Sequence, residues 1–178
     1  MLGRAVELRS RLERDPALAV APDKWGTPPL FYAVERGHLS VVKTLIEFGA
    51  NPVLPATRNG ITPLYVAAAA GHADIVKTLF AFGGDPTAPG RNFRTPLIEA
   101  SQWGHLDTVR TLLELGADPM ALDRDGKAPL FYAATHGHLD VVRILIEFGA
   151  DPMAPSFGQY NVPDAIAEME RIEDGPGE

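Results

Sequence analysis

The chain has no cysteine among its 178 residues, which excludes disulfide bonds and thiolate metal sites. No segment approaches the roughly 18 consecutive apolar residues of a membrane-spanning helix. The charged N-terminal residues also lack the apolar centre of a secretory signal. From these absences we expect a cytoplasmic protein without a membrane segment.

A basic excess is absent too, because the net charge is -7. The acidity is concentrated in residues 164–178, which hold six acidic residues and one arginine. We expect residues 173–178 to form a disordered, solubilising tail. An alternative is that this tail folds back onto basic residues elsewhere in the chain and masks them.

What the chain does contain is a repeated segment. Three landmarks, a Gly-His pair, a Pro-Leu pair and a glycine before Asn/Asp-Pro, recur at steps of 34, 33 and 33 residues. The Gly-His pairs begin at Gly37, Gly71, Gly104 and Gly137. A period of this length indicates one supersecondary unit stacked on itself.

The copy spanning residues 123–155 shows the unit most clearly. Asp125-Gly126 is a tight-turn pair, and Pro129 is suited to the first turn of a helix. A short helix is predicted from there to Gly137, and a second one over residues 139–148. The second helix is apolar on two faces, so it needs neighbours on both sides, which stacking supplies.

This pattern resembles the ankyrin repeat, carried most fully by Gly60-Ile61-Thr62-Pro63-Leu64 and the following Gly71-His72. The resemblance implies an all-α solenoid of helix–turn–helix units with finger-like loops and a concave face. We expect a single domain, 1–178. Its predicted parts are an N-terminal capping helix at 1–22, repeats at 23–56, 57–89, 90–122 and 123–155, and a C-terminal capping half-repeat at 156–172.

Several positions depart from the family pattern. Phe31, Tyr65, Ile98 and Phe131 stand where the family has a histidine that ties repeats together. We expect packing to replace that tie; the other interpretation is an aromatic row that opens onto the groove. An extra residue near Pro55-Ala56 predicts a bulged loop between the first two repeats.

Two helix caps and one turn also differ from the family pattern. Pro28 and Ala128 replace a threonine, which predicts the loss of a helix-capping hydrogen bond in two repeats. Phe93 replaces the finger glycine found as Gly26, Gly60 and Gly126. If that position is left-handed, the third finger either has another shape or retains strain.

No motif for catalysis, a cofactor or a metal is found, so we expect no enzyme activity. His38, His72, His105 and His138 occupy equivalent positions, and packed helices lie about 10 Å apart, too far for shared metal ligation. A structural role is expected for these histidines.

Binding is expected on the fingers and the exposed ends of the first helices, where the repeats differ most. The family resemblance makes this the concave recognition face. Basic and aromatic residues gather there, and both types are common in interface hot spots. The candidate partner-binding residues are Lys24, Trp25, Arg58, Asn59, Ile61, Arg91, Asn92, Phe93, Arg94, Gln102, Trp103, Arg124, Lys127, Thr135 and His136.

We therefore expect a monomeric protein-interaction module whose partner, a protein or peptide, has acidic and apolar features. One alternative is nucleic-acid binding through the basic fingers, which the net negative charge opposes. A second is a structural or self-associating scaffold. A third is that the basic fingers are only solvated, with Trp25 and Trp103 packed against neighbouring fingers.

Overall fold

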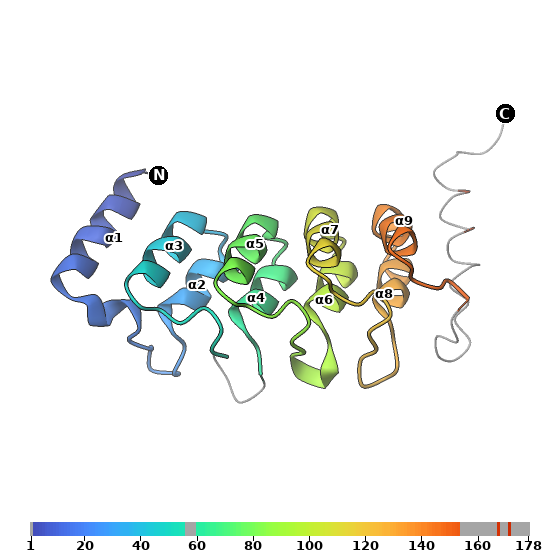
Figure 1. The fold of residues 1–178 in the computed structure, drawn as a ribbon, viewed down its shortest axis with the longest axis horizontal. Helices are drawn as coiled ribbons and strands as arrows, with labels where there is room; N and C mark the ends of the chain where they lie inside the picture. The colour runs from blue at the N-terminus through green and yellow to red at the C-terminus, as the bar shows by residue number, and fades with distance from the viewer. Residues whose placement is uncertain (1, 56–59, 154–166, 168–170, 172–178) are drawn as a thin grey trace.

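The computed structural model describes residues 2–55, 60–153, 167 and 171, and no strand occurs among them. Pairs of short helices stack side by side into an elongated solenoid (Figure 1). The helices are α1 (Leu2–Arg14), α2 (Pro29–Glu35), α3 (Leu39–Glu47), α4 (Pro63–Ala69), α5 (Ala73–Ala81), α6 (Pro96–Gln102), α7 (Leu106–Glu114), α8 (Pro129–Thr135) and α9 (Leu139–Glu147). Two 3-10 turns, η1 (Pro16–Ala19) and η2 (Arg91–Phe93), accompany them.

The helices form two rows. We call α2, α4, α6 and α8 the inner row, and α3, α5, α7 and α9 the outer row. Each inner helix packs against the outer helix that follows it, and against its neighbours in its own row. The connecting loops project from one side of the stack, next to the inner helices (Figure 1). The predicted all-α repeat solenoid is confirmed.

Proline and threonine determine where the inner helices begin. Each inner helix has proline at its first position, where the missing N–H has no helical partner to lose. The hydroxyls of Thr62 and Thr95 accept hydrogen bonds from Tyr65 N and Ile98 N. Pro28 and Ala128 make no side-chain cap, as the sequence predicted for those two repeats.

The core runs the length of the stack. Apolar residues from both rows are fully buried, among them Leu64, Val76, Leu97, Leu112 and Leu145. Because the outer helices are apolar on two faces, α3, α5 and α7 each have a helix packed on either side. The stack therefore holds its inner helices and their loops at regular spacing along one face.

The N-terminal end is built differently from the full repeats. Helix α1 packs against α3 and lies at the end of the outer row, while η1 leads from α1 toward the first finger (Figure 1).

The expected C-terminal half-repeat, residues 156–172, lies outside the described residues except for Ala167 and Arg171, which are helical. The predicted bulge near residue 56 and the tail also lie outside them. No described helix is long and apolar enough to cross a membrane.

Candidate protein-binding site

The finger loops of the first and fourth repeats, residues 23–27 and 123–127, share one construction. A backbone hydrogen bond closes each finger, from Asp23 N to Thr27 O at 3.0 Å and from Asp123 N to Lys127 O at 3.1 Å. In each, the Oδ1 atom of the aspartate accepts hydrogen bonds from the backbone N–H groups two and four residues later. The aspartate thus fixes the turn from inside.

The same aspartates are anchored to the inner helices. Tyr32 donates its hydroxyl hydrogen to Asp23 Oδ2 at 2.6 Å, and Tyr132 does the same to Asp123 Oδ2 at 2.6 Å. The bond from Tyr32 is the largest cause of a lowered pKa for Asp23. Burial, and then the bond to Asp123, raises the pKa of Tyr132 to about 12. These tyrosines hold the fingers in place over the helices.

The third finger, residues 90–94, is built without an aspartate. Gly90 occupies the equivalent position, and its N–H donates to Arg94 O at 2.9 Å. Asn92 and Phe93 both have positive φ, 55° and 58°. Phe93 therefore keeps the left-handed conformation that Gly26, at φ 83°, has in the first finger. The additional left-handed residue, Asn92, makes the turn a different one, so this finger is both reshaped and strained.

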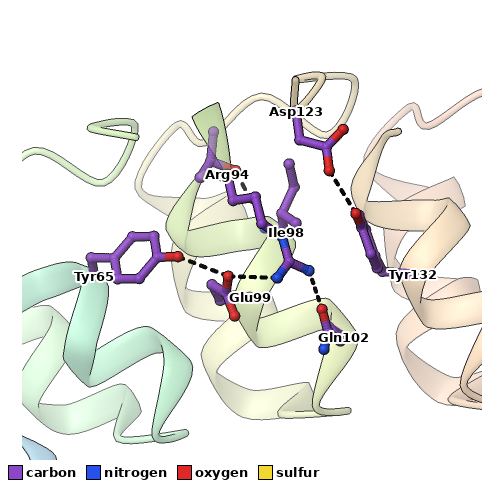
Figure 2. Close-up of polar contacts among 8 residues, drawn as sticks. Tyr65, Arg94, Ile98, Glu99, Gln102, Asp123 and Tyr132 are labelled. Atoms are coloured by element: carbon purple, nitrogen blue, oxygen red, sulfur yellow. Dashed lines mark hydrogen bonds and ion pairs between the residues drawn. The ribbon is translucent and has the colours of Figure 1, made fainter. Parts of the chain in front are cut away.

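A cluster of polar side chains on the inner helices links the second, third and fourth repeats (Figure 2). Tyr65, on α4, donates its hydroxyl hydrogen to Glu99 Oε1 on α6 at 2.7 Å. The same oxygen lies 3.0 Å from Nη1 of Arg94. Glu99 is thus held both by Tyr65 of the preceding repeat and by Arg94 of the third finger. We call the cluster of Tyr65, Arg94, Glu99 and Gln102 the groove floor, after the concave face that the family resemblance implies.

Arg94 is the centre of this cluster. Its Nη2 atom donates to Gln102 Oε1, and its guanidinium carbon lies 4.5 Å from the centroid of the Tyr132 ring. Its side chain is 20% exposed, and its Nε is buried without a hydrogen-bond partner among the described residues. Arg94 and Gln102, both candidate binding residues, thus bond to each other within this cluster.

The cluster also bears on the four residues that replace the family's histidine, which were expected to join the repeats by packing. Phe31, Tyr65 and Ile98 are buried, as the packing interpretation predicted, and Phe131 is half-buried. At Tyr65, however, the tie between repeats is a hydrogen bond rather than packing alone. Burial and the bond to Glu99 raise the pKa of Tyr65 well above its usual value.

Three candidate aromatic residues remain in solvent. Trp25 is 74% exposed, Phe93 is 64% exposed and Trp103 is 58% exposed. Lys24 places its ammonium 4.2 Å from the centroid of the Trp25 ring. The interpretation in which both tryptophans pack away against neighbouring fingers is therefore wrong. Aromatic residues, tryptophan above all, are enriched in interface hot spots.

The remaining candidate residues differ in their surroundings. Asn92 accepts a hydrogen bond from Arg124 N at 2.7 Å, which joins the third and fourth fingers, and the Lys127 ammonium lies 4.6 Å from the Phe131 ring centroid. The Thr135 hydroxyl and the His136 ring bond to backbone carbonyls of their own helix. Arg91 is exposed and Ile61 is half-buried, whereas Arg58 and Asn59 lie outside the described residues.

The repeated histidines tie one repeat to the preceding one. Nε2 of His72 lies 3.1 Å from Glu35 O, that of His105 lies 3.2 Å from Ala69 O, and that of His138 lies 3.0 Å from Gln102 O. Each carbonyl is at the end of the neighbouring inner helix, which leaves it without a helical partner. The structural role expected for these three histidines is confirmed.

Comparison with known families agrees with this architecture. The stack of helix pairs, finger loops and histidine ties defines a solenoid repeat protein. The family model for ankyrin repeats (3 copies) matches residues 13–90 and 83–156. The chain therefore belongs to the ankyrin repeat family. Proteins built from these repeats generally serve as protein–protein interaction modules and are typically non-catalytic. A comparison with curated proteins found no match.

Proposed function

We propose that this chain binds a protein or peptide, with acidic and apolar features, through its fingers and the exposed ends of its inner helices. The observation that carries the proposal is the exposure of Trp25, Phe93 and Trp103, which are 74%, 64% and 58% exposed. Aromatic residues of this size dominate interface hot spots, because they bury a large area with few rotatable bonds.

The acidic feature of the partner follows from the charge of the fingers. Lys24, Arg91 and Arg124 are exposed there, and Lys127 is half-buried, in a chain of net charge -7. Such a local reversal of sign steers an acidic partner to this face and disfavours basic ones. The apolar feature follows from the three exposed aromatic rings beside those charges.

The groove floor supports this proposal by being organised before any partner arrives. Arg94 is held by Glu99 and Gln102, and Tyr65 is held by Glu99. A preorganised surface loses less conformational entropy on binding. We assign Arg94 and Gln102 a positioning role, with direct contact made by the aromatic residues and the exposed finger bases.

The proposal is tested by selecting ligands from a random peptide library displayed on phage. We expect enriched peptides to combine acidic residues with large apolar ones. The triple variant Trp25→Ala, Phe93→Ala, Trp103→Ala should fail to retain them. Phe82→Ala is a matched control, because Phe82 is an exposed aromatic residue at the end of outer helix α5.

Salt dependence separates this function from nucleic-acid binding by the same fingers. A nucleic-acid ligand loses affinity with a slope near -1 per phosphate contact in a plot of log affinity against log salt. A peptide anchored by aromatic burial should show a shallow slope. A steep slope together with binding to single-stranded nucleic acid would favour the alternative.

We propose that one copy binds as a monomer in the cytoplasm. The residues of the cluster in Figure 2, from three successive repeats, contact one another within one chain, which supports a site that needs no second copy. Light scattering across concentration tests the monomer, and cell fractionation tests the location.

A further inference from the structure

The first inner helix, α2, has an inner-row neighbour on one side only. Helix α4 packs between α2 and α6, and α6 packs between α4 and α8. On the other side of α2, the part of the chain that the structure describes places α1 and η1 instead. Helix α1 packs on α3 and continues the outer row (Figure 1). The position equivalent to an inner helix before α2 is therefore not filled by a described inner helix.

A hollow of about 340 Å³ lies at that position, between α1, η1, α2 and α3. Its walls are mainly apolar, and one end has basic side chains. The apolar residues are Leu8, Leu12, Leu18, Pro29, Ala33, Val41 and Leu45, and the polar ones are Arg11, Tyr32, Arg36 and His38. The α2 residues among them are spaced as one helix face, the face turned away from α4.

Comparison with the other repeats shows that this face is normally covered. Pro63, Pro96 and Pro129 are buried at the start of α4, α6 and α8, but the equivalent Pro29 is only half-buried. In the full repeats an inner helix of the preceding repeat provides the cover. The hollow therefore lies where each of the following repeats has an inner helix as its neighbour.

The histidine of the first repeat gives a second, independent observation. His72, His105 and His138 each bond through Nε2 to a carbonyl at the end of the preceding inner helix. His38 lines the hollow and is exposed, and its imidazole has no hydrogen-bond partner among the described residues. If a helix packed against α2 in the way that α2 packs against α4, the His38 imidazole would contact its C-terminal end, as His72 contacts the end of α2.

We propose that this hollow binds an amphipathic helix of a partner protein, with its apolar stripe against Leu8, Leu18 and Pro29, the apolar lining residues that retain exposed surface along with Val41. The C-terminal turn of that helix lies at His38 and Arg36 and carries an acidic residue. Charge complementarity supports this direction, because helix C-termini are electronegative and Arg36 has no ion-pair partner among the described residues. Arg11 already pairs with Glu7 at 2.9 Å, so Arg36 supplies the main free cation.

This hollow adjoins the first finger, because Tyr32 lines it and also bonds to Asp23 of that finger, but the inference does not depend on the proposed function. The structure of the chain provides a template for the occupant. Residues 28–37 include helix α2, which packs against α4 as the proposed partner helix would pack against α2. Glu35 lies in the last turn of α2. A peptide based on this segment is therefore a suitable probe.

The test is an NMR titration of the ¹⁵N-labelled full chain with a stapled peptide copying residues 28–37. The staple joins positions 29 and 33, and the peptide carries Arg36→Ala so that it does not repel Arg36 of the protein. We expect shifts of the amides of Leu8, Leu12, Ala33 and His38. A peptide that also carries Glu35→Gln should bind about threefold more weakly, because it loses one exposed ion pair.

The protein variant Arg36→Gln should remove that threefold difference, while Lys77→Gln, at an exposed residue of α5, should preserve it. The proposal is overturned if these amides do not shift at about 5 mM peptide, where even millimolar affinity gives visible occupancy. It is overturned equally if only finger amides shift. If the same amides shift with protein concentration and no peptide, the occupant is a second copy and the proposed partner is wrong.

Discussion

The ring of Tyr65 lies against the backbone of Gly90, in the space that a side chain at residue 90 would occupy. A Cβ atom placed on Gly90 would lie 2.7 Å from Cε2 of the Tyr65 ring. The first and fourth fingers have an aspartate at this position, whereas the third finger has a glycine. The glycine thus allows Tyr65 to cross the repeat boundary and reach Glu99.

The first prediction concerns this contact. Gly90→Ala should lower the free energy of unfolding by about 1–3 kcal/mol, because the new methyl group overpacks the site. Gly90 has a φ of -94°, so the cost is not one of left-handed backbone. Chemical denaturation measures this change in the free energy of unfolding. In a Tyr65→Ala background the same change should cost at least about 1 kcal/mol less. Equal costs in the two backgrounds would show that the contact is not the cause.

The second prediction concerns the strained third finger. Phe93→Gly should raise the free energy of unfolding by about 0.5–1 kcal/mol, since glycine adopts a φ of 58° without steric cost. The opposite change, Gly26→Ala, should lower it by about 1 kcal/mol, because Gly26 has a φ of 83° and no atom within 4 Å of its added Cβ. Thermal unfolding of both variants checks the pair, and a destabilised Phe93→Gly variant would contradict the assigned strain.

A third prediction addresses the ion pair in the groove floor. Glu99→Gln should cost about 2–3 kcal/mol of stability, because Arg94 and Glu99 are only 20% and 11% exposed and lose a charged hydrogen bond. Glu114→Gln, at an exposed residue, should change stability by less than about 0.5 kcal/mol. Urea unfolding compares the two. A double variant with Arg94→Met should recover part of the loss, since no buried charge is then left alone.

The fourth prediction is the alkaline behaviour of the groove. Tyr132 has its pKa raised to about 12, and that of Tyr65 is raised too, so the folded state keeps protons that the unfolded state releases above about pH 10. This stability is fully present below about pH 10 and is lost as pH rises toward 12. Urea midpoints across that interval should fall less steeply for Tyr132→Phe than for the parent chain. An unchanged slope would show that Tyr132 titrates normally.

Much of the fold follows from the sequence because the repeat brings together local signals that agree. Pro63, the Thr62 cap and Gly71 determine the start and end of one inner helix, and their recurrence determines the others. The two apolar faces of the outer helices require the stack. These are short-range relationships, so each repeat could be interpreted separately.

The proposed binding site was less predictable because its floor depends on residues that are not equivalent in the repeats. The cluster joins Tyr65, Glu99 and Arg94, and it forms only because Gly90 leaves room for the tyrosine ring. A signal was present: Gly90 and Glu99 replace the aspartate and tyrosine that pair in the first and fourth repeats. Sequence reasoning assigned Arg94 to the partner-facing set, and the structure bonds it to the floor. Exposure of Trp25 and Trp103 also depended on packing that sequence alone does not determine.

The central claim is that the exposed aromatic residues of the finger face provide the binding energy, and calorimetric titration with a library-selected peptide tests it most directly. The account predicts that Trp25→Ala, Phe93→Ala, Trp103→Ala weakens binding at least about 100-fold with unfolding temperature little changed, because each hot-spot residue contributes about 1–4 kcal/mol. Phe82→Ala should leave the dissociation constant within about twofold, as expected for a residue outside the interface. An unchanged affinity in the triple variant would contradict the account.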